Sequence, residues 1–401
     1  MKTLLQINAT CNYGSTGRIS EQIAALAELN GWDCFIAHGG RYVRQTSIKT
    51  YQISSRIDNI VHAIKSIVFG RHGLGSKKAT KRFVKWIDEL KPDIIHIHNL
   101  HGYYLNYQLL FEYLSKVDIP IVWTFHDCWA LTGQCTHFVE AACEKWKSGC
   151  HDCDLLQFSY KTCVDRTEKN WMLKCRLFNS VKKMIIVPVS KWLDCVVKES
   201  FLKGYPTCVI NNGIDLSVFK PSACRKKDLG LDERFTLLGV SSGWGNSKGL
   251  EDFIELSKNP EYQIVLVGVQ DGIIDKLPKE IKALKRTKNQ LELVAYYSIA
   301  DVFINPSHAD SFPTVNLEAL ACGTPVITYR TGGSPEAIDE MTGAIVRPGD
   351  LNQLSLKISE FRTSNFKQVH SADCRNRAEE YFDKNKCYKK YLDLYNQLMI
   401  D

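Results

Sequence analysis

Two stretches of the chain repeat the same order of hydrophobic and polar positions. The first has the apolar run TLLQI at residues 3–7, the glycine-bearing segment NATCNYGSTGR and then ISEQIAALAEL. The second has FTLLGV at 235–240, then SSGWGNSKG and LEDFIELSK. A short apolar run is typical of a buried strand, and apolar positions three and four residues apart are typical of an amphipathic helix. We therefore predict that each stretch begins one α/β half of the protein.

Strand and helix patterns alternate after both starts, which is typical of doubly wound parallel sheets covered by helices on both faces. The other predicted strands are CFIAHG, DIIHIHN, IPIVWTFH and KMIIVPVS in the first half, and QIVLVGV, LELVA, DVFINPS, PVITYR and AIVRPGD in the second. The predicted helices lie near 78–90, 104–116, 190–202, 248–258, 277–285, 313–322 and 350–362.

The segment NNGIDLSVFKPSA at 211–223 interrupts both periodicities and predicts the connection between the halves. A chain of 401 residues is long enough for two domains of ordinary size. We expect one Rossmann-like domain over residues 1–207 and a second over 208–384. The amphipathic end of the chain, 385–401, is expected to pack back on the first domain as a helix.

Composition indicates a water-soluble globular protein, because 44% of the residues are hydrophobic and 24% are charged. The sequence contains no apolar run near the roughly 18 residues that a membrane-spanning helix needs. Gln6 and Asn8 interrupt the apolar start, so we interpret it as a first strand rather than a secretory signal. The 15 cysteines are spread along the chain, and we expect a reducing, cytoplasmic location.

Most of the excess positive charge lies in one segment. Residues 56–91 contain nine Lys or Arg and three acidic residues, a balance of 9 − 3 = +6 out of a net +7 for the chain. The stretches SRIDNIVHAIKSIVFG and TKRFVKWIDEL have helical apolar spacing with basic residues between. Such helices lie on anionic lipid or bind an acidic substrate, which suggests peripheral contact with the inner membrane face. A solvated, positively charged helix surface is the alternative.

The stretch INPSHADSFPTVNLEALACGTPVI predicts a strand, a turn and a helix with two acids. Ser311 is the expected N-cap and Pro313 the expected first helical residue. Free amides of Thr314 and Val315 would then face an anion such as a phosphate.

Two carboxylates flank this predicted anion site. Glu318 lies one turn deeper in the helix and can accept hydrogen bonds from a ribose diol, while Asp310 precedes the helix, where an attached sugar would lie. The pattern predicts a nucleotide-sugar site. The alternative is two acids with no ligand, one near a helix start and one solvated.

The two glycine-bearing turns add further candidates. Lys248 opens the helix after SSGWGNS and can reach a diphosphate as a point charge, although an exposed lysine is the simpler alternative. Gly14, Gly17 and Arg18 belong to GSTGR, where glycines allow the backbone to approach a phosphate or an acceptor. This turn is not GxGxxG, which disfavours an NAD enzyme.

These residues together resemble the family 4 glycosyltransferases of the GT-B fold over nearly the whole chain. The most specific likeness is YSIADVFINPSHADSFPTVNLEALACGTPVITYRTGGSPEAI, with two acids that have seven residues between them, followed by a TGG-P-E turn. NNGIDLSVFKP resembles the family's interdomain segment, and TFHD at 124–127 resembles the end of an active-site strand.

The resemblance implies that Glu318 binds the ribose, Asp310 the donor sugar, Lys248 the diphosphate and His126 the sugar from the N-terminal domain. Without that context, His126 would be a hydrogen-bonded histidine at a strand end. The resemblance also implies a retaining transfer that needs no catalytic metal.

The sequence departs from the family pattern in two places. The first acid is Asp310 rather than the commoner Glu, and Gly243 and Trp244 occupy the region where an arginine usually precedes the lysine. Neutralisation of the phosphates then depends on fewer side chains, with Arg18 and Arg330 as candidates.

The N-terminal half offers no clear carboxylate nucleophile for such a reaction. We therefore expect the acceptor to attack on the face from which the diphosphate leaves, with a phosphate oxygen taking the acceptor's proton. Fixed positive charge at the departing phosphate is the main catalytic requirement.

Cysteine and histidine clusters raise the question of a metal. CTHFVEAACEKWKSGCHDC contains Cys135, Cys143, Cys150 and Cys153, which match a structural zinc site in a loop with little core of its own; free or oxidised thiols are the alternative. IHIHNLHGYY contains histidines at 96, 98 and 101, where a metal pair is less expected than histidines of the core or of an acceptor cleft.

We thus expect a retaining glycosyltransferase that moves a sugar from a UDP- or GDP-sugar to a glycan or polyprenyl-linked saccharide in surface polysaccharide synthesis. One alternative is a nucleotide-sugar epimerase or a phosphorylase of the same fold. A second is a protein without enzymatic activity that binds nucleic acid or an anionic surface. For the glycosyltransferase we expect no nucleic-acid partner and no cofactor beyond the zinc considered above.

Overall fold

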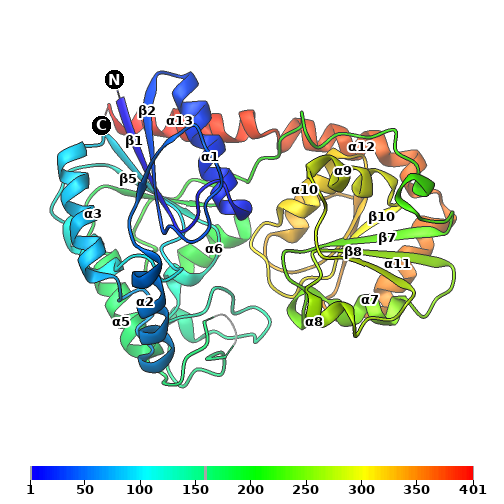
Figure 1. Cartoon of the computed structure of the whole chain (residues 1–401), viewed down its shortest axis with the longest axis horizontal. Helices are drawn as coiled ribbons and strands as arrows, with labels where there is room; N and C mark the ends of the chain where they lie inside the picture. The colour runs from blue at the N-terminus through cyan, green and yellow to red at the C-terminus, as the bar shows by residue number, and fades with distance from the viewer. Residues whose placement is uncertain (1, 158–159, 401) are drawn as a thin grey trace. The chain divides into compact units, whose positions relative to one another are not determined.

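The computed structural model describes residues 2–157 and 160–400. Its chain divides into two compact units, Met1–Asn211 with Tyr388–Asp401 and Asn212–Cys387. Each unit has a six-stranded sheet with helices packed around it (Figure 1). The predicted fold class, two doubly wound α/β units, is confirmed. Among the residues described, none of the helices combines the length and the hydrophobicity needed to span a bilayer.

The sheet of the first unit has the order β3-β2-β1-β4-β5-β6, with every pair parallel. Strand β1, near the centre of this sheet, is buried on both faces, since Leu4, Leu5 and Ile7 have no exposed surface. The elements are β1 Lys2–Asn8, α1 Gly14–Leu29, β2 Trp32–His38, β3 Lys49–Gln52, α2 Arg56–Phe69, α3 Lys77–Leu90, β4 Ile94–Ile97, α4 Tyr107–Leu114, β5 Ile121–Phe125, α5 Thr167–Phe178, β6 Met184–Pro188 and α6 Lys191–Glu199.

The second unit repeats this plan in the order β12-β11-β10-β7-β8-β9. Its core includes Leu237, Ile264, Val302 and Ile327, one from each of four adjacent strands. The elements are β7 Phe235–Val240, α7 Leu250–Leu256, β8 Tyr262–Val267, α8 Asp271–Ile274, β9 Ile281–Leu284, α9 Gln290–Ile299, β10 Val302–Asn305, α10 Thr314–Ala321, β11 Val326–Tyr329, β12 Gly343–Val346, α11 Leu351–Thr363 and α12 Phe366–Tyr381.

One pair of predictions in this unit is wrong. The predicted helix over 277–285 contains β9, which pairs with β8, and the predicted strand LELVA lies inside α9. The side chain of Asn289 caps α9 by accepting a hydrogen bond from the amide of Glu292. Because the next turns of α9 are buried, its apolar run resembles that of a buried strand.

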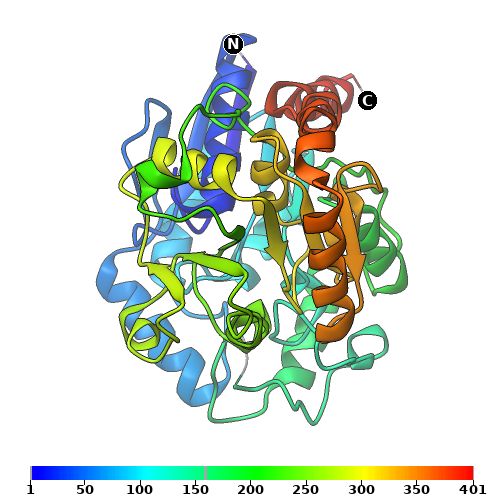
Figure 2. The ribbon, with the colours of Figure 1, turned by 90° about the vertical axis from the view of Figure 1, so that its right-hand side faces the viewer.

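The end of the chain forms two consecutive helices, α12 and α13, the latter over Lys384–Leu398 (orange and red in Figure 2). Tyr395 shares a hydrogen bond with His96 at 2.6 Å, and Tyr391 shares one with Thr124 at 2.9 Å. The last turns of α13 therefore pack on β4 and β5 of the first unit.

Candidate functional site

The strand order in the second sheet, which is parallel throughout, reverses at β7, because β7 lies between β10 and β8. In parallel sheets of this kind, ligands bind beyond the carboxyl ends of the strands at such a reversal. Lys248 ends the short 3-10 helix η4, Asn246–Lys248, that follows β7, and Asp310 lies in the loop after β10. Two predicted site residues are thus placed at the reversal point.

Lys248 and Asp310 contact each other directly. The ammonium nitrogen of Lys248 is 3.1 Å from Oδ2 of Asp310 and also donates to the carbonyl oxygen of Ala309 at 3.1 Å. A third contact, to Oγ of Ser307, is also 3.1 Å long. Three oxygen atoms of the loop after β10 therefore hold the ammonium group of Lys248 in place.

Gly249 allows this close approach of the two loops. Its φ is +68°, and a Cβ atom there would lie 2.5 Å from the carbonyl oxygen of Pro306. The amide of His308 also donates to the carbonyl oxygen of Ser247 at 2.9 Å. A side chain at position 249 would separate the loops that carry Lys248 and Asp310.

Helix α10 begins one residue later than the sequence predicted. Pro313 occupies the N-cap position, no side chain caps the helix, and Thr314 and Val315 are its first two residues. The first amides of an α-helix have no acceptor within the helix, so these two can bind an anion. Ser311 is not the cap, because its buried Oγ atom has no hydrogen-bond partner.

Other buried polar atoms near this helix also have no hydrogen-bond partner. They are Nδ2 of Asn316, Oγ1 of Thr331 and Oγ of Ser334. Ser334 begins the 3-10 helix η5, Ser334–Ala337, which packs against α10. A buried polar group that stays unpaired costs about 1–3 kcal/mol, so this arrangement suits a polar ligand or ordered water. Thr331 and Ser334 belong to the TGG-P-E turn, which was their sequence signal, whereas Asn316 lies in α10.

Glu318 lies in the second turn of α10 and is 8% exposed. The hydroxyl group of Tyr297, on α9, donates to its Oε2 atom at 2.8 Å. Burial, together with the neighbouring Glu318 carboxylate, raises the pKa of Tyr297, so the tyrosine remains a donor. An ionised carboxylate has about four acceptor positions, so it can accept from several donors at once.

In the first unit, GSTGR is not a loop but the first turn of α1. Gly14 has a φ of +67°, and a Cβ atom at Gly17 would lie 2.6 Å from Oγ1 of Thr10. Arg18 follows at intermediate exposure. These residues lie after β1, which borders β4 at the point where this sheet also reverses its strand order.

Three histidines lie in or just after the neighbouring strands β4 and β5. Nε2 of His126 is 3.0 Å from Nδ1 of His98, whose Nε2 is 2.8 Å from Oε1 of Gln6. His96 contacts Thr124 and Tyr395 through its two ring nitrogens. Both ring nitrogens of His96 and of His98 make hydrogen bonds, as expected of buried core histidines rather than of the less expected metal pair. Burial lowers the pKa of His126 to about 4, with His101 adding to the effect and Asp127 opposing it.

A second polar group beside His126 was missed by the sequence reasoning. Nε2 of His101 is 2.7 Å from Oδ2 of Asp127, and its Nδ1 is 2.5 Å from the hydroxyl of Tyr160. Burial alone would raise the pKa of Asp127, but the His101 contact and the amide of Trp129 lower it to about 2. The signal was present in the sequence, because Asp127 is the last residue of TFHD.

Comparison with known proteins decides the family. The profile described as "Glycosyltransferase Family 4" matches residues 21–218, and the one described as "Glycosyl transferases group 1" matches residues 225–381. The chain is a family 4 glycosyltransferase. The prediction of this family, and of an enzyme that transfers glycosyl groups, is therefore confirmed.

Individual relatives agree with this assignment. This glycosyltransferase is 27% identical over 331 residues to WcaC of Escherichia coli (strain K12), provisionally named as a colanic acid biosynthesis glycosyl transferase, covering 77% of each chain. Its structure is similar to sucrose-phosphate synthase from Thermosynechococcus elongatus, with a TM-score of 0.76, 18% identity and full coverage of both chains. It is also similar to Alr3699/HepE of Anabaena in complex with UDP, with a TM-score of 0.68, 15% identity and coverage of 99% and 100%. The fold is therefore GT-B.

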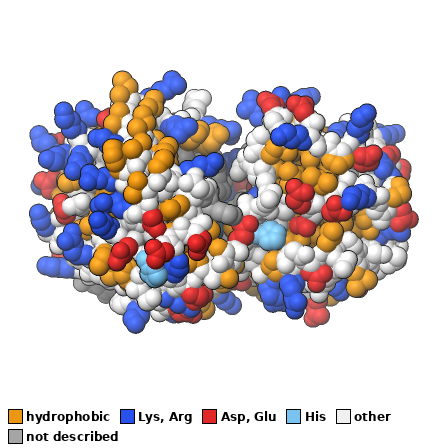
Figure 3. All heavy atoms as spheres, turned by 90° about the horizontal axis from the view of Figure 1, so that it is seen from below, with side chains coloured by type: hydrophobic (Ala, Val, Ile, Leu, Met, Phe, Trp, Pro, Cys, Tyr) orange, Lys and Arg blue, Asp and Glu red, His pale blue; other side chains and the backbone are white. Residues whose placement is uncertain are grey.

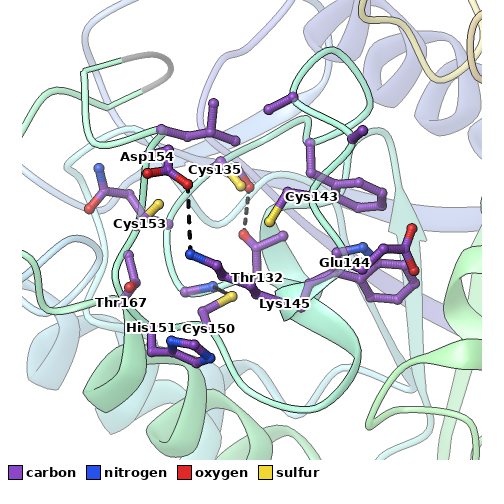
Figure 4. Close-up of a pocket in the computed structure, with 17 residues that line it drawn as sticks. Thr132, Cys135, Cys143, Glu144, Lys145, Cys150, His151, Cys153, Asp154 and Thr167 are labelled. Carbon is purple, nitrogen blue, oxygen red and sulfur yellow. Dashed lines mark hydrogen bonds and ion pairs between the residues drawn. The ribbon is translucent and has the colours of Figure 1, made fainter.

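The glycosyltransferase also carries the cysteine-rich insert between β5 and α5. The four predicted zinc ligands, Cys135, Cys143, Cys150 and Cys153, line one cavity of about 260 Å³ (Figure 4). The amide of Gly133 donates to Sγ of Cys150 at 3.2 Å. Over residues 2–157 and 160–400, however, no group of three or more His, Cys, Asp or Glu side chains is arranged to hold a metal ion. The zinc site stays a prediction.

Proposed function

We propose that this glycosyltransferase moves a sugar from a UDP- or GDP-sugar to a glycan or lipid-linked saccharide, with retention of the anomeric configuration. The observation that carries the proposal is the contact between Lys248 and Asp310 at the reversal point of the second sheet. A cation and a carboxylate lie there beside the loop that leads into α10. This combination suits a ligand that has both phosphate and hydroxyl groups.

Each group of the donor has a candidate partner in this unit. The diphosphate is assigned to the amides of Thr314 and Val315 and to the ammonium of Lys248. Glu318 is assigned to the ribose, held in place by the hydroxyl of Tyr297. Asp310 is assigned to hydroxyl groups of the sugar, and in the first unit His126 is assigned to a substrate hydroxyl.

Charge development explains how these residues would act. As the bond from the anomeric carbon to the phosphate oxygen breaks, negative charge grows on the diphosphate. Lys248 and the N-terminus of α10 provide fixed positive charge at that place, which typically lowers the barrier by several kcal/mol. The proton of the acceptor hydroxyl passes to a phosphate oxygen of the leaving group on the same face of the sugar.

The state of Asp127 supports a reaction without a protein nucleophile. Its carboxylate accepts hydrogen bonds from His101 and from the amide of Trp129 and has a pKa of about 2. Both interactions stabilise the anion, which reduces its tendency to form a covalent bond to carbon. Asp127 is therefore a weak candidate for a covalent nucleophile, and the proposed mechanism remains direct attack by the acceptor.

The similarity to WcaC supports an acceptor in bacterial surface polysaccharide synthesis, since that relative is provisionally named for colanic acid biosynthesis. HepE, whose structure contains UDP, supports a nucleotide diphosphate sugar as the donor. The family match disfavours the epimerase, the phosphorylase and the protein without enzymatic activity.

Ligand-induced stabilisation tests the donor assignment. The melting temperature of the chain is measured with UDP-, GDP- and ADP-sugars, for the wild type and for Glu318→Ala and Lys248→Ala. A donor at 100 times its Kd stabilises the folded state by about 2.7 kcal/mol, so one nucleotide should raise the wild-type Tm clearly and the variants should respond less. Lys258→Ala is the matched control, because Lys258 is exposed and pairs only with Glu255 in the contacts described.

Two outcomes would count against the assignment. If no nucleotide shifts the wild-type Tm, the donor class is wrong; if both site variants respond like Lys258→Ala, the residue roles are wrong. The anomeric configuration of the product, measured by NMR, decides between retention and inversion.

We further propose that α2 contacts an anionic membrane, which would bring the enzyme to a lipid-linked acceptor. Its apolar residues are exposed rather than buried: Ile57, Ile60, Val61, Ile64, Ile67, Val68 and Phe69. A hollow of about 710 Å³ beside them has a basic border that includes Lys65, Arg71, Lys77, Lys78 and Arg166. Figure 3 shows hydrophobic side chains exposed on the first unit with Lys and Arg side chains beside them.

Co-sedimentation with vesicles tests this contact. We expect binding to vesicles that contain anionic phospholipid, weaker binding to neutral vesicles, and loss of binding in the double variant Ile60→Ser and Ile64→Ser. Leu356→Ser is the control, since Leu356 is equally exposed, at 57% against 54% for Ile64, but lies on α11 of the other unit. Equal binding by all variants would remove the proposal.

A further inference from the structure

A chain of buried hydrogen bonds leads from α1 to His126. Nε2 of Gln6 donates to the carbonyl oxygen of Ser20 at 2.8 Å, and Oε1 of Gln6 is 2.8 Å from Nε2 of His98. Nδ1 of His98 is then 3.0 Å from Nε2 of His126. Gln6 has no exposed surface and His98 is 1% exposed. The chain of contacts is thus shielded from solvent up to His126.

The direction of every hydrogen bond in this chain follows from its first member. A carbonyl oxygen cannot donate, so the amide NH₂ of Gln6 must face Ser20 and its Oε1 must face His98. Nε2 of His98 therefore carries a proton and donates it to Gln6. In a neutral imidazole the other nitrogen is then an acceptor, so Nδ1 of His98 accepts from Nε2 of His126.

Both histidines are neutral in this setting. Burial lowers the pKa of His98 well below its usual value, and the neighbouring His96 and His126 lower it further. For His126 the pKa is about 4, with burial as the main cause. A second proton on His98 would make its Nδ1 atom a donor to Nε2 of His126 and would therefore reverse the tautomer of His126.

We propose that Gln6 and His98 are positioning residues that hold His126 in the Nε2–H tautomer, which leaves its Nδ1 atom as a hydrogen-bond acceptor. Near neutral pH, His126 then accepts a hydrogen bond from a substrate hydroxyl and does not act as a proton donor at Nδ1. The role toward substrate depends on the proposed function. The tautomer does not, because it is a property of the protein without substrate.

The assignment also explains why an amide occupies position 6. The neighbours of Gln6 in strand β1, Leu4, Leu5 and Ile7, are apolar and buried. A buried amide without partners is costly, but here both ends of the Gln6 side chain are paired. Because the Gln6 NH₂ group donates to Ser20, its oxygen must accept from His98, which fixes the tautomer of that histidine.

Long-range ¹H–¹⁵N correlation NMR of the full-length, ¹⁵N-labelled protein tests the tautomer directly. The spectrum is recorded at pH 7 without substrate, and His126→Gln and His98→Asn identify the two ring systems among the 11 histidines. We expect a protonated Nε2 and an unprotonated Nδ1 for both rings. A charged His126, or one protonated at Nδ1, would overturn the proposal even if the enzyme transfers sugar as proposed.

Variants of His98 provide the second readout. Asn at this position can still offer an acceptor near the place of Nδ1, whereas Leu cannot. We expect His126 to keep its tautomer in His98→Asn and to lose it in His98→Leu, with kcat/KM reduced about tenfold more in His98→Leu. If the two folded variants show the same His126 tautomer and the same kcat/KM, the positioning role is refuted. If the tautomer changes and kcat/KM does not, Gln6 and His98 do hold the tautomer of His126, but the proposed role of His126 toward substrate is wrong.

Discussion

Lys248 and Asp310 are 62 residues apart in the sequence, and their side chains meet at 3.1 Å. The pair is partly solvated, with side-chain exposures of 33% and 24%. Ion pairs at such positions usually add no more than about 1 kcal/mol to stability. The contact therefore adds little to the stability of the fold, and the proposed function assigns both charges to the donor.

Substitution of Lys248 or Asp310 should change donor binding and transfer more than it changes the free energy of unfolding. In Lys248→Ala we expect the affinity for the donor nucleotide to fall at least tenfold, because the diphosphate loses a cation. In Asp310→Asn we expect near-normal nucleotide binding but a lower kcat for transfer. Isothermal titration calorimetry with the nucleotide and an initial-rate assay separate the two effects. A free energy of unfolding more than about 2 kcal/mol below wild type in either variant would indicate a structural role instead.

The hydrogen bond from Tyr297 to Glu318 should matter for both stability and binding. Tyr297→Phe removes a donor from a buried carboxylate, and we expect a loss of about 1–3 kcal/mol in the free energy of unfolding, measured by urea titration. We expect Glu318→Gln to bind the donor about tenfold more weakly while the sheet stays intact. Similar donor affinity in the wild type and Glu318→Gln would remove the ribose assignment.

Buried histidines should make the protein sensitive to acid. Burial is the main cause that lowers the pKa of His62 and of His126 to about 4, whereas an unfolded histidine has a pKa near 6.5. Between these values the unfolded state binds more protons, so the free energy of unfolding falls as the pH falls from 6.5 to 4. The loss is about 3 kcal/mol for each group once the pH is below both values.

Urea titrations at several pH values measure this slope. We expect His62→Gln to flatten the loss between pH 6.5 and 4, because glutamine can retain the hydrogen bond from the amide of Gly75 to Nε2 without titrating. An equal slope in the wild type and the variant would show that His62 does not contribute.

The cysteine insert should bind one zinc ion per chain. Burial raises the pKa of Cys135 to about 12 and that of Cys150 to about 11, so both are protonated without an ion. Zinc would deprotonate the thiols and draw the four side chains together across their cavity. We expect a one-to-one ratio by elemental analysis of protein purified without chelator.

Two cysteine variants make this test specific. Cys150→Ser should lose the zinc, and Cys195→Ser, at an exposed site on α6, should keep it. Wild-type protein that contains no zinc, with all four thiols reactive toward a thiol reagent after unfolding, would show that the insert holds free thiols.

The periodicity of apolar residues and the positions of Gly, Pro and capping residues were sufficient to predict most of the strands and helices. The runs around Leu4, Leu237 and Ile327 are apolar on both faces, which is typical of strands inside a parallel sheet. These patterns gave the wrong elements at residues 277–299. There α9 is a buried helix whose apolar run resembles a strand, and β9 is a strand at the edge of the sheet. The patterns also placed the cap of α10 at Ser311, although backbone geometry places it at Pro313.

The sequence by itself determined the chemistry available to this protein: the cation at 248, the acids at 310 and 318, a helix start within one residue of 314 and the histidine at 126. These follow from residue type and local spacing, which are properties of short segments. Only the tertiary structure decided that Lys248 reaches Asp310, that Tyr297 donates to Glu318 and that Gln6 fixes His126 through His98. Each of these contacts joins different strands or helices, and their meeting depends on strand order and register, which local patterns do not specify.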